Sequence, residues 1–68
     1  MKNKEYLMKL LINKKPIRIY LLGEDLGIYT YDEEKNRYQG KFGYAGVKEL
    51  IKCVNGDERF NHIQIEGV

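Results

Sequence analysis

The clearest periodic pattern lies in residues 45–55, where apolar side chains recur every three or four positions. Such spacing gives a helix one apolar stripe, while lysine and glutamate occupy the opposite face. The stripe consists of Tyr44, Val47, Leu50, Ile51 and Val54. The pair Asn55-Gly56 then offers two residues that tolerate the left-handed conformation found at helix ends. The pattern predicts an amphipathic helix over residues 45–55.

Strand-like patterns lie on both sides of this helix. Four runs have the length and the β-branched or aromatic composition of strands; they are residues 17–22, 27–32, 37–42 and 60–66. The last run alternates apolar and polar positions, which predicts one buried and one wet face. Residues 23–26 form a plausible hairpin loop, and the polar segment 32–36 is a second turn.

Residues 6–12 fit two structures. As a helix, their apolar side chains would surround most of the circumference and leave no clean polar face. As a strand, every second residue from Tyr6 to Ile12 is apolar and shares one side. Asn13-Lys14 could then turn the chain, and Pro16 is acceptable at the start of the next strand. We favour the strand and keep the helix as the alternative.

The sequence thus predicts one α+β domain spanning residues 1–68. Its small antiparallel sheet would follow the order β-β-β-β-α-β, with one helix packed on one face. If residues 6–12 are helical, the order becomes α-β-β-β-α-β. A chain of this size buries only about 60% of its unfolded surface, so the core is thin. Any ligand cleft should be shallow or shared with a partner.

Composition places the chain among folded intracellular proteins. It is 43% hydrophobic and 32% charged, and its single cysteine cannot form an internal disulfide. No apolar run approaches the roughly 18 residues of a membrane span, and no signal-peptide pattern is present. We therefore expect a cytoplasmic location without membrane contact. Abundant Lys, Ile, Asn and Tyr suggest an AT-rich bacterial or phage genome.

The net charge of +2 hides alternating basic and acidic blocks. Residues 1–22 and 37–54 are mainly basic, whereas residues 23–36 are mainly acidic. Complementary solvated faces account for such blocks on a small domain. Head-to-tail self-association through the opposite patches is the alternative interpretation.

Few residues are available for catalysis. The chain has no serine, so the remaining pair of nucleophile and base is Cys53 with His62. A packed cysteine and an exposed histidine are the favoured interpretation, because Cys53 lies beside the apolar stripe of the predicted helix. We predict no catalytic residues and no cofactor.

No metal site is predicted either. Asp32, Glu34 and Asn36 imitate the first ligands of a calcium loop. However, Arg37 replaces the required glycine and Gly43 replaces the bidentate glutamate. A solvated hairpin turn explains this segment better.

Aromatic residues suggest a binding surface instead. If Leu26, Ile28 and Thr30 face the helix, the tyrosines of the same run project from the other face of the sheet. The candidate partner-binding residues are Tyr29, Tyr31, Tyr38, Arg18 and Arg37. Exposed tyrosine and arginine are typical of binding hot spots. The alternative is cross-strand pairing that only supports the sheet. We expect a non-enzymatic binding or regulatory protein that contacts another protein or a second copy of itself.

Residues 39–47 place two aromatic rings beside glycines and a lysine. This segment resembles the RNP1 motif of RNA-recognition and cold-shock domains, whose aromatic residues stack on bases. The resemblance implies a single-stranded nucleic-acid interface at Lys41, Phe42 and Tyr44. The same segment also reads as an ordinary strand-to-helix turn, with the glycines easing the bend. Nucleic-acid binding is therefore the alternative function.

Overall fold

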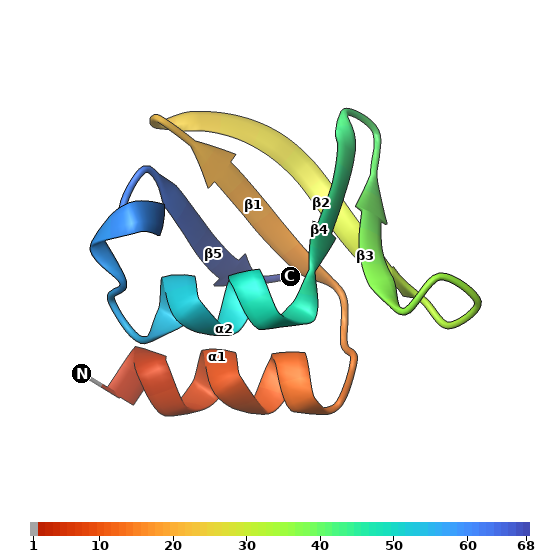
Figure 1. The fold of residues 1–68 in the computed structure, drawn as a ribbon, viewed down its shortest axis with the longest axis horizontal. Coiled ribbons are helices and arrows are strands. Elements are labelled where there is room, and N and C mark those ends of the chain that lie inside the picture. The colour runs from red at the N-terminus through yellow and green to blue at the C-terminus, as the bar shows by residue number, and fades with distance from the viewer. Residues whose placement is uncertain (1) are drawn as a thin grey trace.

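Five antiparallel strands form one sheet, and two helices lie together on one side of it (Figure 1). The computed structural model describes residues 2–68, with side chains from Lys4 onward. The strands are β1 (Ile17–Leu21), β2 (Glu24–Asp32), β3 (Arg37–Gly40), β4 (Gly43–Gly46) and β5 (Ile63–Gly67). The helices are α1 (Lys2–Ile12), α2 (Val47–Val54) and the short 3-10 helix η1 (Glu58–Phe60). The sheet order is β4-β3-β2-β1-β5, so β4 and β5 are its edges.

The α+β class is confirmed, with an antiparallel sheet and helical packing on one face. The helix predicted over residues 45–55 is α2, and the predicted last strand is β5. The element order is α-β-β-β-β-α-β, because residues 43–46 form a strand of their own before α2. Neither α1 nor α2 is both long and apolar enough to cross a lipid bilayer.

The preference for a strand over residues 6–12 is wrong, because this segment belongs to α1. The helix ends in a Schellman-type stop. The Lys15 N–H donates to the Leu10 carbonyl at 2.9 Å, and the Lys14 N–H donates to the Leu11 carbonyl at 3.2 Å. Lys14 has φ 57°, the left-handed conformation that this stop requires. Packing of Leu11 into the core gives the helix its buried side, while Ile12 stays exposed.

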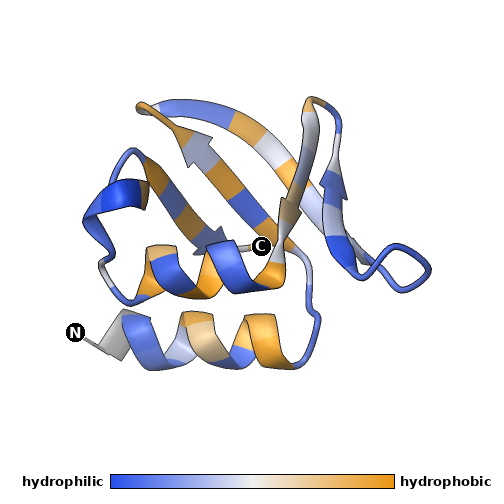
Figure 2. Cartoon of the chain, in the orientation of Figure 1, coloured by the Kyte–Doolittle hydropathy of each residue, from blue (hydrophilic) through white to orange (hydrophobic). Residues whose placement is uncertain are grey.

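The core lies between the helices and the facing side of the sheet, and Figure 2 shows the apolar bands that alternate with polar ones along α2, β1 and β5. Its buried members come from both helices and from β1, β2, β3 and β5. They are Leu11, Ile17, Ile19, Tyr29, Tyr38, Leu50 and Ile65. Gly40 makes room for this packing, because a Cβ there would lie 2.6 Å from the ring of Tyr29.

A β-bulge interrupts the pairing of β1 with β2. The register shifts by one residue, so that both Leu26 and Gly27 lie opposite Ile19. Gly27 has φ 89°, which glycine adopts more easily than other residues, and its N–H donates to Asp25 Oδ1 at 2.8 Å. The bulge reverses which residues of β2 face the helices.

This reversal corrects the predicted faces of β2. Leu26, before the bulge, packs against the core as expected. After the bulge, Tyr29 is buried, and Tyr31 packs against the core from the same side. Ile28 and Thr30 are exposed. The prediction that Ile28 and Thr30 face the helix is therefore wrong, since a shift of one residue moves alternate side chains to the other face.

Candidate functional site

The three predicted tyrosines do not form an exposed surface together. Tyr29 is 4% exposed and Tyr38 is 0% exposed, so the expectation that they project into water is wrong. The Tyr38 hydroxyl donates to the Lys15 carbonyl at 2.7 Å, and burial raises the pKa of Tyr38. Tyr31 is half-buried and meets the Tyr38 ring edge to face, with centroids 5.5 Å apart. These tyrosines join the sheet to the core, as in the structural alternative.

The two predicted arginines lie on the face of the sheet that no helix covers, but on different strands. Arg18 on β1 pairs with Asp25 at 2.9 Å. The guanidinium of Arg37 on β3 lies 3.7 Å from the ring centroid of Tyr44. Because β2 separates β1 from β3, the structure does not gather Arg18 and Arg37 into one site.

The residues of the nucleic-acid alternative are accessible. Phe42 is 68% exposed and Tyr44 is 63% exposed. The Lys41 ammonium lies 5.8 Å from the centroid of the Phe42 ring. Their setting differs from rings on a sheet surface, because Phe42 occupies the turn between β3 and β4, and Tyr44 lies on an edge strand.

A shallow apolar cleft lies beside β4. Its inner part is a hollow of about 140 Å³ at the open end of the curved sheet. The hollow is lined by Ile19, Leu21, Leu26, Tyr29, Tyr44, Ala45, Leu50 and Ile63. Its outer part is a groove of about 360 Å³, lined by Arg37, Tyr44, Ala45, Gly46, Glu49, Phe60 and Ile63. We call these two connected parts the β4 cleft, because they share Tyr44, Ala45 and Ile63.

Exposed apolar side chains occur near this cleft at two hairpin turns. Figure 1 shows the β1–β2 and β3–β4 turns on the side of the molecule away from the helices. Figure 2 shows both tips as apolar. Leu21, at the first turn, lines the hollow, and its neighbour Leu22 is 80% exposed. Phe42, at the second turn, immediately precedes β4.

The conformation of Leu22 is unusual for an exposed leucine. Leu22 and Gly23 have φ 52° and 83°, as in the type I′ turn that joins two strands. Asn is strongly preferred at the first of these positions, because positive φ is costly for a residue with a larger side chain. The Leu22 N–H donates to the His62 carbonyl at 2.8 Å, which ties the turn to β5. A strained backbone thus presents an apolar side chain to water.

Sequence reasoning named three residues of the cleft lining, Tyr29, Arg37 and Tyr44, but missed the others. Leu21 and Leu22 read as the end of a strand, and Phe60 as the start of one. The available signal was Gly23, because a glycine between two strand-like runs marks a two-residue hairpin turn. Leu22 is the other residue of that turn.

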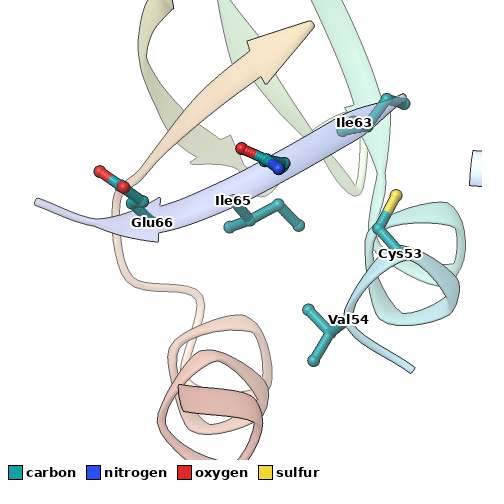
Figure 3. Close-up of a pocket in the computed structure, with 6 residues that line it drawn as sticks. Cys53, Val54, Ile63, Ile65 and Glu66 are labelled. Atoms are coloured by element: carbon teal, nitrogen blue, oxygen red, sulfur yellow. The ribbon is translucent and has the colours of Figure 1, made fainter. Parts of the chain in front are cut away.

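The candidate cysteine and histidine are not arranged as an activated pair. Figure 3 shows Cys53 pointing from α2 toward β5. Burial raises the pKa of the Cys53 thiol, which favours the protonated form and weakens a nucleophile. His62 is exposed in the turn before β5. Within residues 2–68, no three His, Cys, Asp or Glu side chains are grouped to hold a metal ion.

The segment that imitates a calcium loop is a hairpin turn. Asp32 Oδ1 accepts the N–H groups of Glu34 and Lys35 at 3.0 and 3.3 Å. Asn36 has φ 55° and accepts the Tyr31 hydroxyl at 3.3 Å. The Asp32 side chain therefore organises the turn between β2 and β3.

In comparisons with protein-family models, with curated proteins and with solved structures, the chain has no significant match.

Proposed function

We propose that this chain is a protein-binding module that holds an apolar side chain of a partner in the β4 cleft. The observation that carries the proposal is Leu22. It is 80% exposed, it adopts a left-handed backbone conformation, and it follows Leu21 of the cleft lining. Strained and exposed apolar residues are retained where function requires them.

The inner hollow of the cleft is sized for a side chain. Its volume of about 140 Å³ is below the roughly 300–1,000 Å³ of pockets that enclose a whole small molecule. A single aliphatic or aromatic side chain fits a hollow of that size. The adjoining groove of about 360 Å³ then accommodates the backbone on either side of the anchor.

The edge position of β4 adds to this surface. Among residues 2–68, β4 pairs only with β3. An extended segment lying in the groove therefore meets backbone groups of β4 that no neighbouring strand occupies. The proposed ligand is an extended peptide with one large apolar anchor, and Phe42 and Tyr44 provide contact area around it.

Selection of peptides from a random library tests the proposal. We expect the selected peptides to share one large apolar residue. Truncation of Tyr44, which lines both parts of the cleft, should weaken their binding in the Y44A variant by about 2 kcal/mol, roughly thirtyfold, as is typical of an aromatic hot spot. Its free energy of unfolding should change by no more than about 1 kcal/mol, since Tyr44 is exposed and loses only its contact with Arg37.

Ile12→Ala is the matched control. Ile12 is as exposed as Tyr44, but it lies on α1 and does not line the β4 cleft. Peptide affinity should be unchanged in this variant. If Y44A and I12A weaken peptide binding equally, or if the peptides share no apolar anchor, the β4 cleft is not the binding site.

Single-stranded nucleic acid is the second candidate, because two exposed rings lie beside cations. Arg37 covers one face of the Tyr44 ring at 3.7 Å, whereas the Lys41 ammonium lies farther from the Phe42 ring, at 5.8 Å, so Phe42 is the more accessible ring for stacking on a base. The test is a titration with mixed-sequence single-stranded DNA at 50 and 200 mM salt. Binding that weakens steeply with salt and is lost in Phe42→Ala supports this function. Binding that is absent at both salt concentrations rules it out.

A further inference from the structure

The second edge of the sheet, β5, is regular along its whole length. Its register with β1 runs without a shift from Leu21 opposite Ile63 to Ile17 opposite Gly67. Among residues 2–68, β5 pairs only with β1. Edge strands are usually blunted by shortness, bulges, proline or lysine. β4 has four residues, two of them glycine, whereas β5 has five residues without a proline, a lysine or a bulge, and its one charged side chain is Glu66.

One hydrogen bond shows which residues of β5 direct their backbone groups toward β1 and which direct them toward the free edge. The Leu22 N–H donates to the His62 carbonyl, in register with the β1–β5 ladder. Antiparallel strands alternate between hydrogen-bonded and non-hydrogen-bonded pairs. Gln64 and Glu66 therefore direct their backbone groups toward β1. The N–H and carbonyl groups of Ile63, Ile65 and Gly67 point to the free edge.

This edge is open to solvent along its length. A hollow of about 290 Å³ lies between residues 63–66 and the side chains of Cys53 and Val54 on α2 (Figure 3). A second hollow of about 310 Å³ lies beside residues 65–68 and is lined by Tyr6 and Leu7 of α1. Together the two hollows leave space for one more strand next to β5.

We propose that β5 pairs with β5 of a second copy of this chain, so that two five-stranded sheets join into one. In an antiparallel arrangement around a two-fold axis at Ile65, Ile65 lies opposite the partner's Ile65. Ile63 then lies opposite the partner's Gly67. In this register Ile63, Ile65 and Gly67 each form a hydrogen-bonded pair with a residue of the partner strand. All N–H and carbonyl groups that point outward from these three residues are then bonded.

The exposed side chains fit the same register. Gln64 lies opposite the partner's Glu66, and the reverse pair forms on the other side of the axis. An amide facing a carboxylate is a favourable cross-strand pair. Sliding the strands by two residues toward the carboxyl end would instead put Glu66 opposite the partner's Glu66. Like charges directly opposite each other are destabilising, so charge disfavours this slide relative to the register centred on Ile65.

A charge pair at position 64 tests the proposal. Gln64 is exposed and makes no hydrogen bond through its side chain within the described residues, so its substitution should leave the monomer folded. Gln64→Glu places two like-charge pairs in the dimer and should raise its dissociation constant roughly tenfold. Gln64→Lys places two opposite-charge pairs there and should lower it by a similar factor. Gln64→Ala is the neutral control.

Sedimentation velocity up to about 1 mM protein measures these constants, because a ten-residue ladder makes a weak dimer. The wild type should show monomers and dimers in an equilibrium that depends on concentration. A strictly monomeric wild type at 1 mM overturns the proposal. So does a dimer whose dissociation constant is the same in Gln64→Glu and Gln64→Lys, because it would use another surface.

Amide hydrogen exchange gives an independent readout. The Gln64 and Glu66 amides bond to β1 in the monomer, so their protection should not depend on concentration. The Ile65 amide points to the free edge and should become protected only as the dimer forms. An Ile65 amide that exchanges equally fast in dilute and concentrated protein contradicts pairing through β5.

Discussion

Tyr38 is fully enclosed yet keeps a polar hydroxyl, which ties the sheet to the segment after α1. Its bond to the Lys15 carbonyl is 2.7 Å long. We expect Tyr38→Phe to lower the free energy of unfolding by about 1 kcal/mol, because this bond is lost without a replacement. Tyr31→Phe removes a longer, exposed bond of 3.3 Å to Asn36 and should cost at most about 0.5 kcal/mol. Urea denaturation of both variants measures the difference, and equal losses would contradict a structural role for the Tyr38 hydroxyl.

Asp25 couples the β-bulge to pH. Its carboxylate accepts the Gly27 N–H and pairs with Arg18, and both interactions lower the pKa of Asp25 below 3.8. The ionised form thus stabilises the folded state at neutral pH. This stabilisation is lost as the pH falls through 3.8 and below, when the carboxylate takes up a proton. In Asp25→Asn, denaturation midpoints measured from pH 6 to pH 2 should fall less steeply than in the wild type.

Asp57 is the internal comparison for this titration. Its bonds to Arg59 also lower the pKa of Asp57, in the turn before β5. Asp25→Asn should therefore keep part of the acid sensitivity, and the double variant with Asp57→Asn should lose more of it. An unchanged slope in Asp25→Asn would mean that the Arg18 pair is too solvated to matter.

A single glycine explains why the faces of β2 could not be predicted by alternation. The sequence predicts a strand over residues 27–32, and exposed and less exposed side chains do alternate from Ile28 to Tyr31. Alternation alone does not say which of the two sets of side chains faces the helices. The bulge at Leu26 and Gly27 decides this. An isolated glycine inside a strand pattern is a known sign of a bulge. Applying that sign would have placed Tyr29 inside and Ile28 outside.

At the scale of elements, α1 provides a direct test of its own assignment. In the helix, Leu11 is buried and Ile12 is exposed. In a strand with Ile12 on the buried side, the two roles would be exchanged. Leu11→Ala should therefore cost about 2–5 kcal/mol of unfolding free energy, whereas Ile12→Ala should cost about 0.5 kcal/mol or less. Chemical denaturation distinguishes the two, and a larger loss in Ile12→Ala would contradict the helix.

The sequence predicts the two helices with different clarity. α2 has a clean apolar stripe and is followed by Asn55-Gly56, with Gly56 in the positive-φ conformation at 85°. α1 has apolar residues around its circumference and ends through Lys14, a residue that no composition rule marks as a helix stop. Tertiary packing of Leu11 decides the case, and packing is not visible in local periodicity. The strand β4 was missed for a similar reason, since its two glycines read as a turn.

The candidate site likewise has a part that the sequence predicts and a part that only the folded structure shows. Phe42 and Tyr44 were identifiable as accessible aromatics because glycines surround them in the sequence. The inner hollow of the cleft combines β1, β2, β4, α2 and β5, and it brings Leu21 and its strand partner Ile63 close to Ala45 of the opposite edge strand. Residues that share a surface through long-range topology leave no local trace in one sequence.

At the scale of the whole molecule, the proposed cleft and the proposed dimer edge use different surfaces. The cleft lies at the hairpin tips and the outer side of β4, whereas pairing uses the backbone edge of β5 beside α1 and α2. Ile63 contributes its side chain to the cleft and its backbone to the edge. The two surfaces can therefore be occupied at the same time, and a dimer would carry two clefts.

Two clefts on one assembly predict avidity on a surface that displays many peptides. A dimer bound through both clefts dissociates only when both release, so its apparent dissociation is slower than that of a monomer. Surface plasmon resonance with the protein injected at or above the dissociation constant of the dimer should show slower dissociation of the wild type from a dense layer of a selected peptide than from a sparse layer. Gln64→Glu, with its weakened dimer, should lose most of this density dependence while keeping the same affinity for free peptide. If dissociation of Gln64→Glu still depends on peptide density, the bivalent binding comes from a surface other than β5. If Gln64→Glu binds free peptide more weakly than the wild type, the β5 edge and the β4 cleft are coupled through Ile63.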